Sequence, residues 1–116
     1  MDFVLKWTKR ANAEYVDLRE AARIALAARE RHGKKKSSEA EGLFKQVLKT
    51  LSLLACNPKH PGLKTHEFDS LPHPYTKDDK VWEAYIQNKT PGAYQLFWCY
   101  GPKQGEMTII AITPHP

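Results

Sequence analysis

The chain has 116 residues, which is enough for one domain with a single buried core and too few for two. Its apolar stretches fall far below the roughly 20 residues that cross a bilayer, and residues 1–7 hold no apolar signal region, so we expect a cytoplasmic protein without a membrane span. The net charge of +5 belongs to residues 1–49, where twelve Lys and Arg outnumber seven Asp and Glu, because residues 50–116 carry six of each.

Residues 3–7 alternate as a short strand, and two amphipathic helices follow. Thr8 is placed to cap a helix over residues 9–32, in which apolar residues recur at spacings of three and four. Ser38 and Glu41 have the spacing of a capping box and begin a second helix. The apolar stripe of this helix, which runs down to Cys56, consists of Leu43, Phe44, Val47, Leu48, Leu51 and Leu54. Two stripes joined by a short connector predict a helical hairpin whose stripes lie in the core.

Short strands are predicted for the second half, because β-rich or alternating stretches are separated by loops that contain Pro and Gly. They cover residues 63–68, 81–87, 94–100 and 107–113, with a type II turn expected over residues 88–92. The sum is one α+β domain over residues 1–116, in which the hairpin packs on one face of a four- to five-stranded, mostly antiparallel sheet. The other face of the sheet is expected to be open to solvent.

The period of two along each strand divides the side chains between these faces. The set predicted to meet the helices is Trp82, Ala84, Ile86, Tyr94, Leu96, Trp98 and Tyr100. The set predicted to face outward is Lys64, His66, Glu83, Tyr85, Gln95 and His115, the last in phase with Ile109, Ala111 and Thr113.

The outward set contains the groups that RNA cleavage needs. Attack of a 2′-hydroxyl on its own phosphate requires a base, an acid and positive charge. His115 with either His66 or Glu83 is a candidate acid/base pair, Lys64 is a candidate source of charge, and Tyr85 is a candidate stacking platform for a base. A basic surface is also suited to RNA, DNA or an acidic protein.

Neither a metal nor another cofactor is expected. Cys56 and Cys99 lack the spacing of metal ligands and are predicted to be small buried hydrophobes. Each candidate site residue also has an ordinary interpretation. Glu83 and Tyr85 suit the solvent side of any strand, and His115 is close to a chain end, where side chains often contact only water.

Several segments, taken in their order along the chain, resemble the RelE/ParE toxin superfamily. They are Asn57-Pro58, Leu63-Lys64, the strand around Trp82, Tyr94-Gln95-Leu96 and the final His115. The members are small bacterial proteins, mostly ribosome-dependent mRNA endonucleases that need no metal. The resemblance implies a type II toxin–antitoxin system, with mRNA on the ribosome as target and an acidic antitoxin as partner. It also implies a role for His115 in proton transfer and for Lys64 in binding phosphate.

The chain departs from the superfamily at Gln95. Ribonuclease members typically read Tyr-Arg-Leu at this strand, and that arginine grips the scissile phosphate. Glutamine carries no charge, and a charged hydrogen bond is roughly twice as strong as a neutral one. The resemblance therefore implies a nuclease weakened at Gln95, or one in which another cation compensates.

An alternative of another class stays open. A ParE-like relative of the same fold would act by binding DNA gyrase or a partner protein, without chemistry. Such proteins do not rely on a catalytic histidine, so a dispensable His115 would favour this alternative. An inactive relative is a third option that the sequence does not rank.

Overall fold

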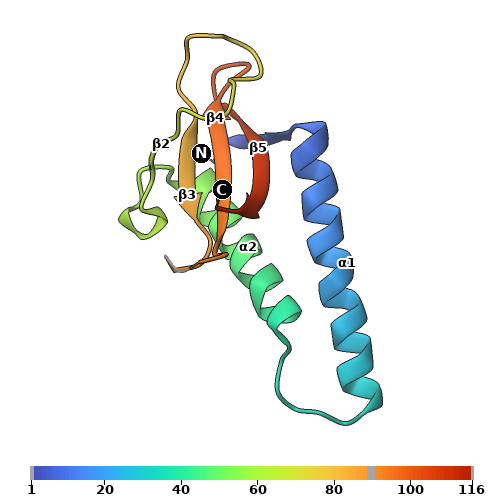
Figure 1. Ribbon diagram of the computed structural model, residues 1–116. Coiled ribbons are helices and arrows are strands. Elements are labelled where there is room, and N and C mark those ends of the chain that lie inside the picture. Colours follow the sequence, from blue (N-terminus) through green and yellow to red (C-terminus); the bar gives the residue numbers. More distant parts are fainter. Residues whose placement is uncertain (1, 89–90, 116) are drawn as a thin grey trace.

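A computed structural model of the chain describes residues 2–88 and 91–115. The elements are β1 (Val4–Trp7), α1 (Lys9–Arg31), α2 (Glu39–Cys56), the short 3-10 helix η1 (Pro61–Leu63), β2 (His66–Glu67), β3 (Trp82–Tyr85), β4 (Tyr94–Tyr100) and β5 (Glu106–Pro114). The strands form one sheet in the order β1-β5-β4-β3-β2, parallel between β1 and β5 and antiparallel elsewhere. Both helices lie on one side of this sheet (Figure 1). The predicted α+β architecture is confirmed.

The starts of both helices agree with the prediction. The Thr8 hydroxyl accepts a backbone N–H from the first turn of α1 at 3.0 Å. At α2 the Ser38 hydroxyl accepts the Glu41 N–H at 3.2 Å, and the Glu41 carboxylate accepts the Ser38 N–H at 2.8 Å. Arg29 near the end of α1 also pairs with Glu41, at 2.9 Å, and this hydrogen bond is the main reason why the pKa of Glu41 is lowered to about 2. This ion pair therefore joins the two helices beside the loop that connects them.

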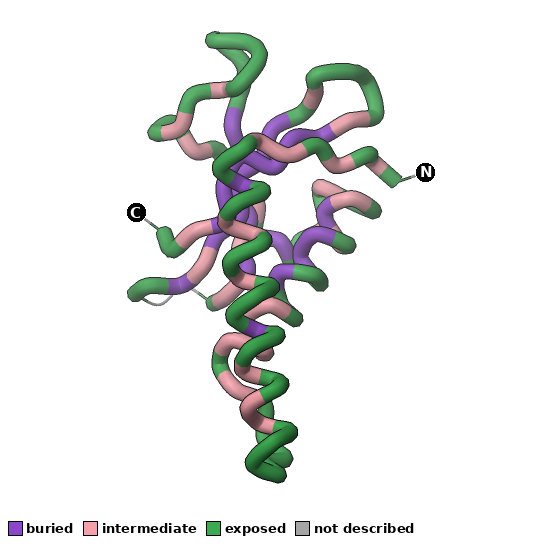
Figure 2. The backbone as a smooth tube through the Cα atoms, turned by 90° about the vertical axis from the view of Figure 1, so that its right-hand side faces the viewer, coloured by how far each residue is buried: buried purple, intermediate pink, exposed green. Residues whose placement is uncertain are grey.

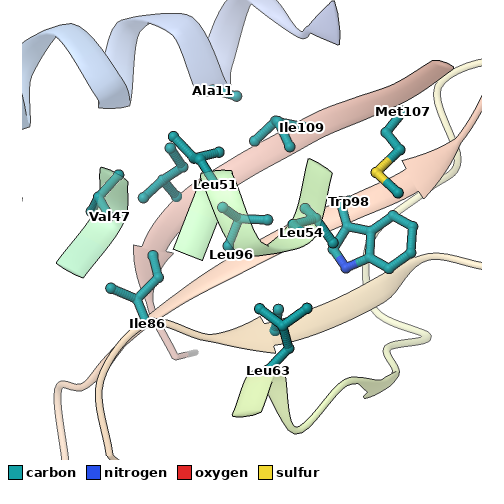
Figure 3. Packing of buried hydrophobic residues seen from close by; sticks show 12 residues of the cluster. Ala11, Val47, Leu51, Leu54, Leu63, Ile86, Leu96, Trp98, Met107 and Ile109 are labelled. Atoms are coloured by element: carbon teal, nitrogen blue, oxygen red, sulfur yellow. The ribbon is translucent and has the colours of Figure 1, made fainter. Parts of the chain in front are cut away.

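The main core lies between the hairpin and the sheet (Figure 3). Trp98, Leu54, Leu63, Leu96, Met107, Ile109 and Ile112 are its largest fully buried side chains. Trp82 and Tyr94 pack against it from the edge and are half-buried. The predicted face toward the helices is therefore correct for β3 and β4, because the bulky alternate residues have the largest apolar area to remove from water.

The hairpin extends well beyond the sheet, which gives the molecule dimensions of 51 × 28 × 25 Å (Figure 2). Leu48 was predicted to lie in the core with the rest of its stripe, but it is 42% exposed. The prediction was wrong because Leu48 faces the outer part of α1, where the sheet no longer covers the hairpin. It lines a shallow apolar groove between the helices with Leu26 and Phe44.

The second face of the sheet is not open throughout, contrary to the prediction. A smaller buried cluster there consists of Val81, Phe97, Cys99, Ile110 and Ala111, with Phe68 and Leu71 packed against it. Phe68 and Leu71 belong to the long segment between β2 and β3, which folds back over this face. The Thr108 hydroxyl also lies 2.9 Å from the hydroxyl of Tyr75 in the same segment. The part of this face that stays uncovered therefore lies beside β2 and at the end of β5.

A register shift between β4 and β5 changes which residues of β5 face the helices. Phe97 is opposite Ala111, whereas the next residue, Trp98, is opposite Ile109. Ile109 therefore points to the main core and not, as predicted, to the face of Ala111 and Thr113. A bulge of this kind inserts one residue and reverses the alternation beyond it.

The first turns of α1 hold the part of β5 that β1 does not pair. The Thr8 hydroxyl donates to the Ile110 carbonyl at 2.8 Å, and the Ile112 N–H donates to the Glu14 carboxylate at 3.0 Å. These two bonds satisfy backbone groups at the strand edge that would otherwise be buried without partners. They also fix the end of β5, from which His115 follows.

The cysteines differ from each other, although both were expected to be buried. Cys99 is buried, and burial raises the pKa of its thiol to about 11, whereas Cys56 is exposed at the end of α2. No helix within the described residues is long and apolar enough to cross a membrane. The turn predicted over residues 88–92 includes Lys89 and Thr90, which lie outside the described residues, although Gly92 has the positive φ of +78° that such a turn requires.

Candidate active site

A buried carboxylate joins two histidines on the second face of the sheet. Glu83 in β3 is only 1% exposed. One of its oxygens, Oε1, lies 2.5 Å from His66 Nε2, and the other, Oε2, lies 2.7 Å from His115 Nδ1. Both imidazoles are half-exposed. We call these three residues the His–Glu–His cluster.

The edge of the sheet brings the first two members together. His66 in β2 is the antiparallel register partner of Glu83 in β3, so their side chains leave the same face side by side. His66 Nδ1 also lies 3.2 Å from the Lys64 carbonyl oxygen. The ring of His66 is therefore held from both of its nitrogens.

His115 arrives from the other side of β4. Its backbone N–H donates to the Ala93 carbonyl at 2.9 Å, directly after β5 ends. Since β4 lies between β5 and β3, the contact of His115 with Glu83 requires the His115 side chain to reach over β4. The His115 ring also meets the ring of Phe68 at 6.3 Å between centroids.

The two rings differ in their contacts. Both nitrogens of His66 lie close to oxygen atoms, those of the Lys64 carbonyl and the Glu83 carboxylate. A buried carboxylate is tolerated inside a protein only when it is paired, and the two imidazoles are the partners of Glu83. His115 donates from Nδ1 to Glu83, which leaves Nε2 as a free acceptor when the ring is neutral.

Tyr85 and Gln95 lie on the same face as the cluster, as their strand positions predicted. The Tyr85 ring meets the His66 ring edge-on at 5.7 Å between centroids. Gln95 lies between Tyr85 and Thr113 in the strand register, but it is only 2% exposed. Its side-chain oxygen is buried and has no hydrogen-bond partner within the described part of the chain. Gln95 is therefore not on an open groove.

Lys64 does not share a strand face with His66, contrary to the prediction. The strand expected over residues 63–68 is reduced to two residues, and Lys64 ends η1 in the left-handed conformation with φ of +50°. Its side chain lines a cavity beside Trp82 and Trp98, which belong to the helix side of the sheet. The prediction was wrong because a left-handed residue breaks the strand alternation on which it depended.

Two features of the cluster were not anticipated from the sequence. The first is Phe68, whose ring packs beside that of His115. Because Phe68 follows His66 by two residues, strand alternation could have placed it on the same face. The second is the pair of backbone carbonyls, of Lys64 and Ala93, that hold the histidines. No residue pattern reveals these. Among the described residues, no group of three or more His, Cys, Asp or Glu side chains is arranged to hold a metal ion.

Comparisons with known proteins bear on the fold. No protein-family profile and no curated protein sequence matches the chain. The structure of a YoeB/ParE toxin from Agrobacterium tumefaciens superposes with a TM-score of 0.62 over 97% of this chain and 99% of its own, at 10% identity. The YoeB dimer from Staphylococcus aureus gives a TM-score of 0.57 over 100% of both chains, at 9% identity. The predicted fold, a helical hairpin on one face of a five-stranded sheet, is thus shared with these two structures.

Proposed function

We propose that the protein is a RelE-like toxin of a bacterial type II toxin–antitoxin system, and that it cleaves mRNA on the ribosome in the cytoplasm. The observation that carries this proposal is the His–Glu–His cluster, a buried carboxylate in contact with two half-exposed imidazoles. The toxin fold of the two similar structures supports the assignment.

The two histidines divide the proton transfers between them. His115 Nε2 accepts the proton of the 2′-hydroxyl, and the 2′-oxygen forms a bond to the adjacent phosphorus. The bond from phosphorus to the 5′-oxygen of the next nucleotide breaks, and the His66 imidazolium protonates that oxygen. The products are a 2′,3′-cyclic phosphate and a 5′-hydroxyl. Acid, base and charge all come from the protein, so the reaction requires no metal.

Glu83 positions both rings and stabilises their charge. Before the reaction it balances the His66 imidazolium, and after proton transfer it balances the one formed at His115. Tyr85, beside His66, is placed to stack on a base next to the scissile phosphate. Gln95 supplies no charge where ribonuclease members have arginine, so we propose that phosphate stabilisation is weaker in this chain.

An acidic antitoxin is the partner that this proposal requires. The excess of positive charge lies within residues 1–49, and hence mostly on the helical hairpin. A basic hairpin attracts an acidic, partly disordered segment that wraps over it. Co-expression with the neighbouring short reading frame should suppress growth inhibition if that frame encodes the antitoxin.

Glu83→Gln tests the proposed reaction. The amide keeps the size of the carboxylate but cannot balance an imidazolium, so we expect cleavage of ribosome-bound mRNA to fall about 100-fold or more. The pH profile of the remaining activity should also change, since both imidazoles lose their counter-charge. Glu67→Gln on the same sheet edge is the matched control, because Glu67 is exposed and pairs with Lys80. A folded Glu83→Gln protein with parental activity would exclude this mechanism.

Gln95→Arg tests the missing cation. Arginine brings a permanent charge to the face of the cluster, and its long side chain can extend from the buried position toward the substrate phosphate. We expect cleavage of ribosome-bound mRNA to rise about tenfold or more. Gln95→Met, which keeps the length without the charge, should show no gain. If the folded arginine variant shows no gain, phosphate chemistry is not the task of this surface.

A further inference from the structure

A second recess lies outside the His–Glu–His cluster, on the helix side of the sheet edge. It is a cavity of about 440 Å³ between the segment that follows α2 and the β3–β4 pair. Its walls include Trp82, Trp98 and Tyr100, and its rim includes Lys59, Lys64 and Thr65. We call it the tryptophan pocket. None of these residues takes part in the cluster through its side chain.

The wall of the tryptophan pocket is aromatic. Trp82 and Trp98 stack with an angle of 27° between their planes and 6.2 Å between centroids, and Tyr100 meets Trp98 edge-on at 4.9 Å. Tyr100 was predicted to lie in the core with the rest of its strand face, but it is 42% exposed, because it is at the end of β4. Aromatic side chains in this arrangement offer flat surface to a planar ligand.

Two polar groups of the pocket lack partners. The indole N–H of Trp98 and the hydroxyl of Thr65 are buried, and neither forms a hydrogen bond within residues 2–88 and 91–115. Trp98 as a whole is only 1% exposed, and its nitrogen lies on the ring edge toward Leu63 (Figure 3). Buried polar groups are nearly always bonded, so an unpaired donor here points to a ligand that brings an acceptor.

The charge at the rim is positive. Lys59 and Lys64 are exposed, and neither forms an ion pair with a carboxylate in the described part of the chain. Lys80, which lies over the Trp82 ring, is in contrast neutralised by Glu67. Two free ammonium groups beside an aromatic wall suit a planar group that carries a phosphate.

We propose that the tryptophan pocket binds an unpaired nucleobase of the RNA strand, with the phosphate of that nucleotide on Lys59 and Lys64. The inference rests on the proposed function for the identity of the strand. Acceptor atoms at the base edge take the indole N–H of Trp98 and the hydroxyl of Thr65, and the base stacks on the exposed Tyr100. An apolar protein segment would leave both polar groups and both lysines unpaired, so a nucleotide fits the pocket better.

The pocket and the cluster lie on the two sides of one sheet edge. β2 is the outermost strand, and Lys64 and His66 are two residues apart at its start. Trp82 and Glu83 are neighbours in β3 whose side chains point to opposite faces. A single strand that crosses the edge at β2 therefore contacts both places, and the base in the pocket positions the scissile phosphate at the cluster.

The test uses the His115→Ala protein, so that cleavage does not interfere. The four nucleoside 5′-monophosphates are titrated while the indole N–H signals of the tryptophans are recorded by NMR. We expect the Trp98 signal to shift on titration, and the Trp7 signal, from a ring that packs on Tyr15, to stay in place. Inorganic phosphate should not move the Trp98 signal. An unmoved Trp98 signal overturns the proposal, and so does an equal shift with phosphate alone.

Variants test the same pocket with a short single-stranded RNA in that background. Tyr100→Ala should weaken binding about tenfold, and Lys59→Gln should weaken it severalfold, whereas Lys36→Gln at the hairpin tip should have no effect. Thr65→Val removes a buried hydroxyl without a partner, so it should weaken binding without lowering the melting temperature. Unchanged binding in all three pocket variants overturns the proposal. Because binding is measured without cleavage, this outcome is independent of whether the parent protein is a nuclease.

Discussion

Replacing His115 by alanine should lower the cleavage of ribosome-bound mRNA by about 100- to 10,000-fold, the usual contribution of a general base or acid. Among the described residues, both ring nitrogens of His66 have a polar contact, whereas His115 has one only at Nδ1. Expression of the His115→Ala protein should no longer inhibit growth. The fold should persist, because the ring is half-exposed and His66 still balances Glu83.

Two further variants separate chemistry from structure at this position. His115→Asn can still donate a hydrogen bond to Glu83 but cannot take a proton at neutral pH, so it should be as inactive as alanine. His32→Ala, at the exposed end of α1, should behave like the parent. If the protein remains toxic with alanine at position 115, the toxicity comes from binding, and a ParE-like mode of action replaces the nuclease.

Trp98→Ala should cost about 3–5 kcal/mol of the free energy of unfolding, a large part of what a small domain possesses. Trp98 is fully buried between the hairpin and the sheet, where it contacts Trp82 and Tyr100. Trp82→Ala should lower the free energy of unfolding by less, because Trp82 is only half-buried. Urea unfolding followed by circular dichroism measures both midpoints.

Trp98→Phe keeps this experiment informative if the alanine variant does not fold. Phenylalanine fills most of the space, and it removes an indole N–H that has no partner in the described chain. Trp98→Phe should therefore lower the free energy of unfolding clearly less than Trp98→Ala does. A Trp82→Ala protein less stable than Trp98→Ala would contradict the burial of the two rings.

Local sequence patterns determined the elements and most of their faces. Thr8 and Ser38 start the helices as predicted, since a cap depends on residues within one turn. The alternation around Trp82 and Leu96 identified the core face of β3 and β4, because the period of two is a property of the strand itself. The same alternation placed His66 and Glu83 on one face.

Only the tertiary structure decided how those residues meet. The left-handed Lys64 and the bulge in β5 interrupted the alternation, so Lys64 and Ile109 were assigned to the wrong faces. Gln95 is buried, and the His115 side chain meets Glu83 across β4. His115 and Glu83 are 32 positions apart in the sequence. Contacts of this kind depend on the order of the strands and on backbone carbonyls, and a pattern of side chains encodes neither. The sequence by itself therefore supplied the chemical groups, and the packing of the sheet edges supplied their geometry.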